Sequence, residues 1–171
     1  MPSKIPVISI VAPSSEYGKT RLITGVVASL AESNVRTCVI KHTAHETPPD
    51  FEKDTWRFRE AGALASALLN SKGLATYYIP KSSLEEAVET MASQGADIII
   101  CEGFKESPLP KIVIINGEED LTLLTSLSNI VATVAKRPIK PETGVPVLDY
   151  DVRSVTAFIH DFCLRFLGVP G

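Results

Sequence analysis

The sequence has no excess of positive charge, few cysteines and no long apolar run, and each absence excludes a class of protein. Lysine and arginine total 17 against 20 for aspartate and glutamate, a net charge of −3, which argues against broad electrostatic binding to nucleic acid or a membrane. Cys38, Cys101 and Cys163 lie far apart within apolar runs, so they predict buried thiols in a reducing cytoplasm. No apolar run reaches membrane-spanning length, and no signal peptide is visible.

What remains is an ordinary globular composition arranged in an α/β pattern. The 171 residues, 44% of them apolar, suffice for one domain with a sizeable core, so residues 1–171 are expected to form a single domain. Continuous Val and Ile runs without polar alternation indicate a mostly parallel sheet between two layers of helices, a three-layer fold. The expected strands cover residues 5–11, 36–41, 66–70, 76–79, 96–101, 111–116, 130–135 and 146–149.

Two helices carry clear start signals. Apolar residues follow helical spacing from Leu84 to Ala92, and Ser82 with Glu85 has the spacing of a capping box. Near the end of the chain, a second apolar stripe runs over residues 152–166. Asp151 stands immediately before this stripe and is predicted to cap the helix.

The stretch IVAPSSEYGKTRL, residues 10–22, places Gly-Lys-Thr between a predicted strand and a predicted helix. This is the context of a Walker A phosphate loop (P-loop), in which backbone N–H groups and the helix N-terminus attract phosphate. Lys19 would reach the β- and γ-phosphates, and the Thr20 hydroxyl would face Mg²⁺. An accidental Gly-Lys-Thr at a helix start is the alternative. The expected nucleotide-binding residues of this stretch are Ser14, Ser15, Tyr17, Gly18, Lys19, Thr20 and Arg21.

A second motif, ADIIICEGFK at residues 96–105, ends the most apolar strand in a carboxylate. At the C-terminal end of a buried strand beside a phosphate loop, Glu102 can hold Mg²⁺ through water or orient an attacking water. We therefore expect Glu102 to have both a metal-binding and a catalytic role. A solvated loop carboxylate is the alternative.

A third group of polar residues follows the strand at residues 36–41. Loops beyond the C-terminal ends of parallel strands converge on the ligand, so Lys41, His42 and Arg57 are candidates for phosphate contacts and Asp54 for the metal shell. The alternative for Asp54 and Arg57, which lie on a short predicted helix, is a mixed charged surface.

Taken together, these motifs resemble the molybdopterin-guanine dinucleotide biosynthesis protein B (MobB) family. The resemblance rests on VISIVAPSSEYGKTRLI, VIKHTAHE, KDTWRFREAGA and ADIIICEGFK, and it continues through NIVATVAKRP and VPVLDYDVRSVTAFI. It implies a P-loop NTPase-like fold, binding of GTP and Mg²⁺, at most slow GTP hydrolysis, and a homodimer. It also implies a supporting role in attaching a nucleotide to the molybdenum cofactor, with a MobA-like guanylyltransferase as partner. By the motif matches, Lys19 and Thr20 carry the phosphate and Mg²⁺ roles, and Asp54 and Glu102 carry acidic roles nearby.

The chain departs from the glycine-rich loop of that family at Ala12, Pro13 and Arg21. Proline fixes φ and lacks an N–H donor, so weak GTP binding is expected. Two other functions remain open on sequence grounds: a non-catalytic adaptor for the cofactor nucleotidyltransferase, and a small P-loop kinase or ligase. Guanine preference rests on the resemblance, because the sequence contains no NKxD motif.

Overall fold

The computed structural model describes residues 5–43, 48–73, 75–78, 83–139 and 144–168. The chain divides into two compact units, one built from residues 1–42 and 88–171 and the other from residues 43–87. Each unit is described by itself, and the single nucleotide-binding domain expected over residues 1–171 stays a prediction.

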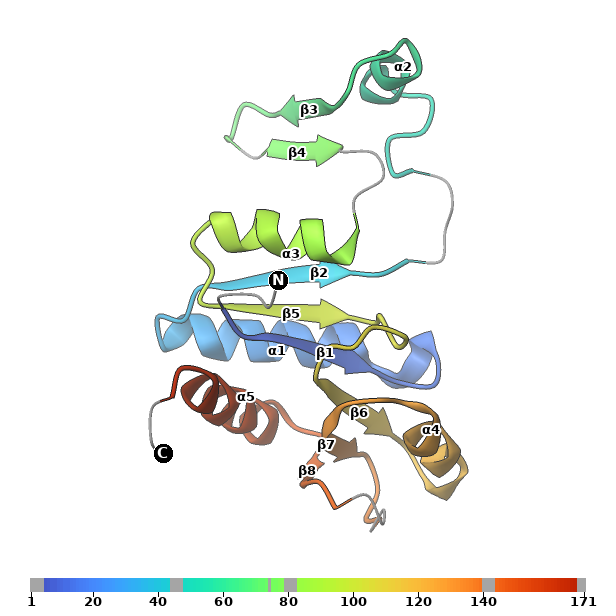
Figure 1. Cartoon of the computed structure of the whole chain (residues 1–171), viewed down its shortest axis with the longest axis vertical. Helices are drawn as coiled ribbons and strands as arrows, with labels where there is room; N and C mark the ends of the chain where they lie inside the picture. Colours follow the sequence, from blue (N-terminus) through green and yellow to red (C-terminus); the bar gives the residue numbers. More distant parts are fainter. Residues whose placement is uncertain (1–4, 44–47, 74, 79–82, 140–143, 169–171) are drawn as a thin grey trace. The chain divides into compact units, whose positions relative to one another are not determined.

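The larger unit is built on a six-stranded sheet with the order β2-β5-β1-β6-β7-β8 (Figure 1). Every pair of neighbouring strands is parallel, and β1, β5 and β6 are buried along their whole length. This confirms the α/β class and the mostly parallel sheet. The strands are β1 (Val7–Val11), β2 (Thr37–Lys41), β5 (Ile98–Glu102), β6 (Lys111–Ile115), β7 (Ile130–Ala135) and β8 (Val147–Asp149).

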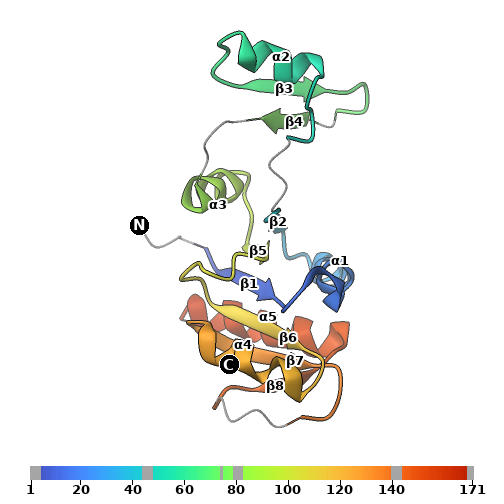
Figure 2. The ribbon, with the colours of Figure 1, turned by 90° about the vertical axis from the view of Figure 1, so that its right-hand side faces the viewer.

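Helices cover both faces of this sheet. The apolar sides of α1 (Lys19–Glu32) and α5 (Val152–Phe166) form one core with β1, β5, β6 and β7. On the other face, α4 (Leu121–Ser126) packs over β6 and β7, and residues 88–93 of α3 (Leu84–Ser93) lie on the side opposite α1 (Figure 2). No helix in the described part of the chain is long and apolar enough to cross a membrane.

The helix caps agree with the sequence in one case and correct it in another. Asp151 caps α5 as predicted, because its Oδ1 accepts the N–H of Ser154 at 2.9 Å. Ser82 lies outside the described residues, and the reciprocal bonds of a capping box join Ser83 and Glu86 instead, at 3.0 and 3.1 Å. The box that begins α3 is therefore one residue later than predicted.

A buried lysine fixes the connection between β5 and β6. The Lys111 side chain is fully buried, and its ammonium donates to the carbonyls of Ser107, Leu109 and Ser128. Burial lowers the pKa of Lys111. Because these carbonyls belong to the segments that enter β6 and β7, the lysine holds the chain after β5 against the sheet.

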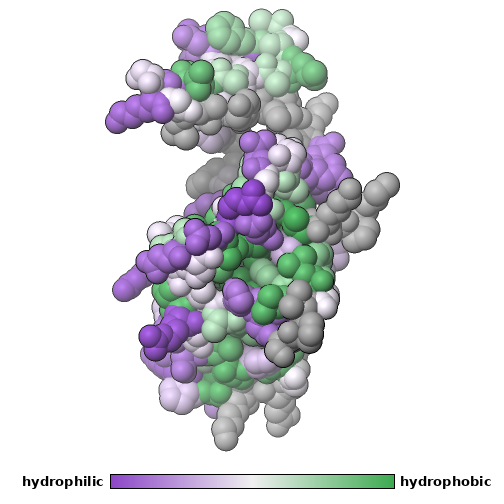
Figure 3. Space-filling model, turned by 90° about the vertical axis from the view of Figure 1, so that its left-hand side faces the viewer, coloured by the Kyte–Doolittle hydropathy of each residue, from purple (hydrophilic) through white to green (hydrophobic). Residues whose placement is uncertain are grey.

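The smaller unit consists of α2 (Asp54–Glu60) and an antiparallel hairpin of β3 (Ser66–Leu69) and β4 (Ala75–Tyr78). Asp50, whose side chain is fully buried, pairs with Arg59 at 2.8 Å and accepts the Thr55 hydroxyl at 2.6 Å. The bonds from Arg59 lower the pKa of Asp50 to about 2. Hydrophobic side chains, in green, lie on the face of this unit that Figure 3 shows. The large apolar side chains exposed in this unit are Phe51, Phe58, Leu64, Leu68 and Leu69.

Candidate functional site

The segment that was predicted as a phosphate loop connects the buried strand β1 to the N-terminus of α1. After β1, Ala12 is buried in the core, residues 15–17 form a short 3₁₀ turn, and Gly18 takes the left-handed conformation with φ 73°. A Cβ at Gly18 would also lie 2.3 Å from the Tyr150 hydroxyl, so glycine is required there. No side chain of the N-cap residue Gly18 caps α1, and an uncapped helix N-terminus is a favourable position for an anion.

Lys19 lies along this loop. Its Nζ donates to the carbonyl of Ser14 at 2.5 Å. Burial is the main cause that lowers the pKa of Lys19, Glu102 opposes it, and the nearby ammonium groups of Lys105 and Lys41 lower it further. Glu16 is exposed to solvent, so its carboxylate does not fill the loop.

Three of the predicted site residues, Thr20, Glu102 and Lys41, lie in contact with one another beside the loop. Lys41 and Glu102 are register partners on the neighbouring strands β2 and β5, and Lys41 Nζ lies 3.3 Å from Glu102 Oε1. The Thr20 hydroxyl lies 2.9 and 3.0 Å from the two oxygens of that carboxylate, whose side chain is only 9% exposed. A hydroxyl and a carboxylate are hard oxygen donors of the kind that Mg²⁺ prefers, so this pair fits the metal.

The other predicted site residues of the larger unit differ in exposure and in their contacts. Ser14, Ser15 and Arg21 are exposed around the loop. His42 donates its backbone N–H to the Glu102 carbonyl at 2.9 Å, and its ring lies 5.1 Å from the ring of Phe104. It thus supports the backbone that follows Glu102.

Asp54 and Arg57 belong to α2 in the smaller unit. Asp54 Oδ1 and Arg57 Nη1 are 3.8 Å apart, and both side chains are largely exposed. The larger unit alone holds the phosphate loop. The metal role of Asp54 and the phosphate role of Arg57 therefore stay predictions.

Two tyrosines and a lysine hold the loop in place, and the sequence analysis did not predict this role for them. Tyr150, which follows β8, donates its hydroxyl to the Gly18 carbonyl at 3.0 Å. Tyr17 donates its hydroxyl to Asp120 at 2.7 Å, which raises the pKa of Tyr17 to about 12. Lys136 Nζ lies over both rings, 5.6 Å from the centre of Tyr17 and 4.7 Å from that of Tyr150. These contacts anchor the loop to the start of α4 and to the segments that follow β7 and β8.

Lys105 is a further residue of the site that sequence analysis did not assign. Its Nζ donates to the Pro13 carbonyl at 2.8 Å, at the opening end of the loop. The only signal in the sequence is its position three residues after Glu102.

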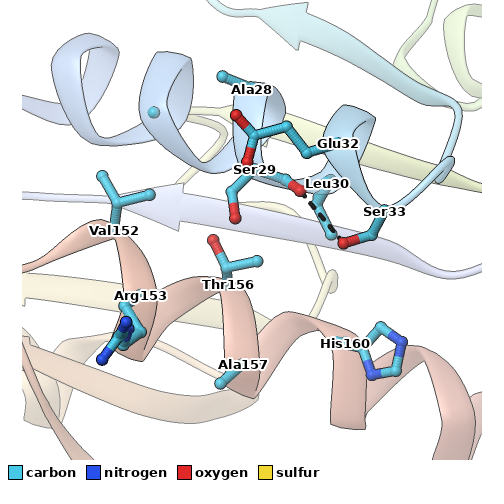
Figure 4. Close-up of a pocket in the computed structure, with 11 residues that line it drawn as sticks. Ala28, Ser29, Leu30, Glu32, Ser33, Val152, Arg153, Thr156, Ala157 and His160 are labelled. Atoms are coloured by element: carbon cyan, nitrogen blue, oxygen red, sulfur yellow. Dashed lines mark hydrogen bonds between the residues drawn. The ribbon is translucent and has the colours of Figure 1, made fainter.

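A groove lies between α1 and α5, away from the predicted phosphate loop (Figure 4). Small residues and the longer side chains of Glu32, Arg153 and His160 line it. The Thr156 hydroxyl points toward Ser29 and has no hydrogen-bond partner among the described residues. The groove includes neither Lys19 nor Glu102, so it is separate from the candidate phosphate site.

Comparisons with known proteins give this geometry a family context. The family model described as molybdopterin guanine dinucleotide synthesis protein B matches residues 7–136. The molybdopterin-guanine dinucleotide biosynthesis adapter protein of Haemophilus influenzae is 30% identical over 98% of this chain and 95% of that protein. The probable adapter protein of the same name from Bacillus subtilis is 30% identical, over 90% of this chain and 91% of that protein.

Solved structures of MobB proteins are similar to this chain as well. The crystal structure of a MobB homolog from Bacillus stearothermophilus is 25% identical, with a TM-score of 0.72 over 93% of this chain and 98% of that chain. The crystal structure of Bacillus subtilis MobB has a TM-score of 0.74 over 92% of this chain and 97% of that chain; at 23% identity it supports the fold alone.

Proposed function

The chain belongs to the molybdopterin guanine dinucleotide synthesis protein B (MobB) family, and from this premise we propose that it is a cytoplasmic GTP-binding adapter protein in molybdopterin guanine dinucleotide synthesis. Curated relatives that match nearly the whole chain carry the adapter name. The observation that carries the GTP proposal is the Thr20–Glu102 pair beside the Lys19 loop.

In this proposal, different residues of the chain bind the phosphates and the metal. The N–H groups of the first turn of α1 and the Lys19 ammonium bind phosphate oxygens. Thr20 and Glu102 would hold Mg²⁺, which would supply positive charge to neutralise the phosphates. Pro13 removes one N–H contact to a charged ligand, worth about 1.5–3 kcal/mol, so affinity is about ten- to a hundredfold below that of a glycine-rich loop.

Hydrolysis is at most slow in this proposal. Glu102 is the carboxylate expected to orient a water, and Thr20 and Lys41 already engage it. A general base must reach its proton at hydrogen-bond distance, and an engaged carboxylate does this poorly. The same observation favours the second candidate, a non-catalytic adaptor that binds nucleotide without turnover.

We also propose that the protein is a homodimer, through the smaller unit. A two-stranded hairpin with a seven-residue helix is too small to bury a core of its own. Leu64 is 90% exposed and Leu69 is 69% exposed, and a second copy that covers these side chains would remove them from water.

The adapter role is tested with a purified MobA-like guanylyltransferase, GTP and molybdopterin. We expect the chain to form a complex with the transferase and to increase formation of the guanine dinucleotide. Lys19→Ala is expected to keep the complex and lose the increase. An unchanged product yield together with no complex by light scattering would refute the role.

A further inference from the structure

Two lysines, rather than one, hold the opening end of the phosphate loop. Lys105 Nζ donates to the carbonyl of Pro13 at 2.8 Å, and Lys19 Nζ donates to the carbonyl of the next residue, Ser14, at 2.5 Å. The charge on Lys105 is close enough to lower the pKa of Lys19. A second ammonium group therefore stands at the part of the loop where Pro13 offers no N–H donor.

The backbone that carries Lys105 is strained. Gly103 and Phe104 both have positive φ, 95° and 60°, and the left-handed conformation is costly for an aromatic residue. Ser9 donates its hydroxyl to the Gly103 carbonyl, and the Ser107 N–H and hydroxyl donate to the Phe104 carbonyl at 3.1 and 2.8 Å. These bonds hold a turn that brings the chain after Glu102 back to Pro13.

The position of the metal-binding pair indicates which phosphate Lys105 meets. In P-loop proteins the residues that hold the metal lie beside the terminal phosphates, and Thr20 and Glu102 would be these residues here. Glu102 ends β5, and Lys105 belongs to the loop that follows the same strand. On the other side of the loop, Tyr17, Tyr150 and Lys136 fill the space beside Gly18. The terminal phosphate is therefore expected on the β5 side, within reach of Lys105.

We propose that Lys105 binds the terminal phosphate of a nucleoside triphosphate and so makes the loop distinguish a triphosphate from a diphosphate. The proposal rests on the nucleotide binding proposed above. A hydrogen bond from an ammonium group to phosphate is stronger than one from a neutral N–H, so Lys105 replaces the donor that Pro13 lacks. When Lys105 Nζ releases the Pro13 carbonyl, it donates to the phosphate instead.

The test compares affinities for GTP and GDP in Mg²⁺ by calorimetry. Lys105→Met keeps the length of the side chain without its charge and is expected to weaken GTP binding by about tenfold or more, with GDP binding changed less than about threefold. Lys105→Arg should restore most of the preference for GTP. Lys72→Met, which removes an exposed lysine of the smaller unit, is the matched control.

The outcomes separate the two proposals. A Lys105→Met variant that weakens both nucleotides equally, or neither, assigns Lys105 a purely structural role and overturns this inference while nucleotide binding stands. A wild-type protein that binds neither nucleotide overturns the proposed GTP binding, and this inference with it.

Discussion

The hydroxyl of Thr20 lies between the two carboxylate oxygens of Glu102, 2.9 Å from one and 3.0 Å from the other. Lys41 Nζ lies 3.3 Å from the same carboxylate and 3.5 Å from the same hydroxyl. Three segments that are distant in sequence thus place a hydroxyl, a carboxylate and an ammonium group at the N-terminus of α1. A divalent cation held by Thr20 and Glu102 would replace the positive charge that Lys41 supplies.

This relationship predicts that Glu102→Gln removes the effect of Mg²⁺ on GTP affinity. The wild-type protein should bind GTP about tenfold or more tightly with Mg²⁺ than with chelator, and the variant less than about threefold, because a neutral amide is a poor Mg²⁺ ligand. Without Mg²⁺, the variant should bind at least as well as the wild type, since one charge that repels phosphate is gone. Glu106→Gln, at an exposed position, should behave as the wild type; equal Mg²⁺ dependence in Glu102→Gln would contradict the metal assignment.

The two tyrosines that anchor the loop should contribute to stability unequally. Tyr150→Phe removes one bond to the Gly18 carbonyl and should lower the free energy of unfolding by about 0.5–1.5 kcal/mol in urea titrations. Tyr17→Phe should cost more, because it deprives the buried Asp120 carboxylate of a donor.

Tyr17 also gives a pH signature. Its folded pKa of about 12 is above the ordinary 10.0, so its contribution to stability is complete below pH 10 and is lost as the pH rises toward 12. Stability of the wild type should therefore fall more steeply than that of Tyr17→Phe over this range. Parallel curves of stability against pH for the two proteins would show that the Tyr17–Asp120 bond does not contribute to stability.

In the smaller unit, the Asp50–Arg59 pair should decide whether α2 and the hairpin stay folded. Asp50→Asn removes the buried negative charge that pairs with Arg59, and amide exchange over α2 and β3 should accelerate by roughly tenfold or more. The carboxyl pKa is lowered from 3.8 to about 2, so in the wild type the stabilisation persists above about pH 4 and is lost as the pH falls toward 2.

Asp54→Asn is the matched control for this pair. It removes the same charge from a side chain that is 84% exposed, and exchange should change little. Equal acceleration in the two variants would mean that the buried pair has no special part in holding the unit together.

Because the smaller unit exposes leucines, we expect the protein to form a dimer that two substitutions in this unit disrupt. Light scattering should give a dimer mass for the wild type and a monomer mass for Leu64→Ser combined with Leu69→Ser, since burial of these side chains would drive association. Leu167→Ser, at a 63% exposed position on the larger unit, should remain a dimer. A monomeric wild type at high concentration would rule out the interface.

The strands of the parallel sheet could be predicted because their signals are local. Unbroken Val and Ile runs indicated the buried parallel strands, and Glu102 and Lys41 could be placed because each ends a predicted strand. The capping box was predicted one residue early because SSLEE satisfies the pattern twice, and only the backbone decides between the two registers.

The rest of the site depends on contacts between distant residues. Tyr150 and Gly18 are 132 positions apart, and Tyr17 and Asp120 are 103 apart, so no local pattern joins them. Lys105 reaches Pro13 because Phe104 adopts a left-handed conformation that an aromatic residue does not signal in a sequence.

The central claim, that the Lys19 loop binds GTP, is tested most directly by calorimetric titration of the wild type and Lys19→Ala with GTP in Mg²⁺. The account predicts a dissociation constant in the roughly micromolar range for the wild type, no measurable binding by Lys19→Ala, and wild-type affinity for the control Lys72→Met. Circular dichroism should confirm that all three are folded. No binding by the wild type, or unchanged affinity in a folded Lys19→Ala variant, would contradict the claim.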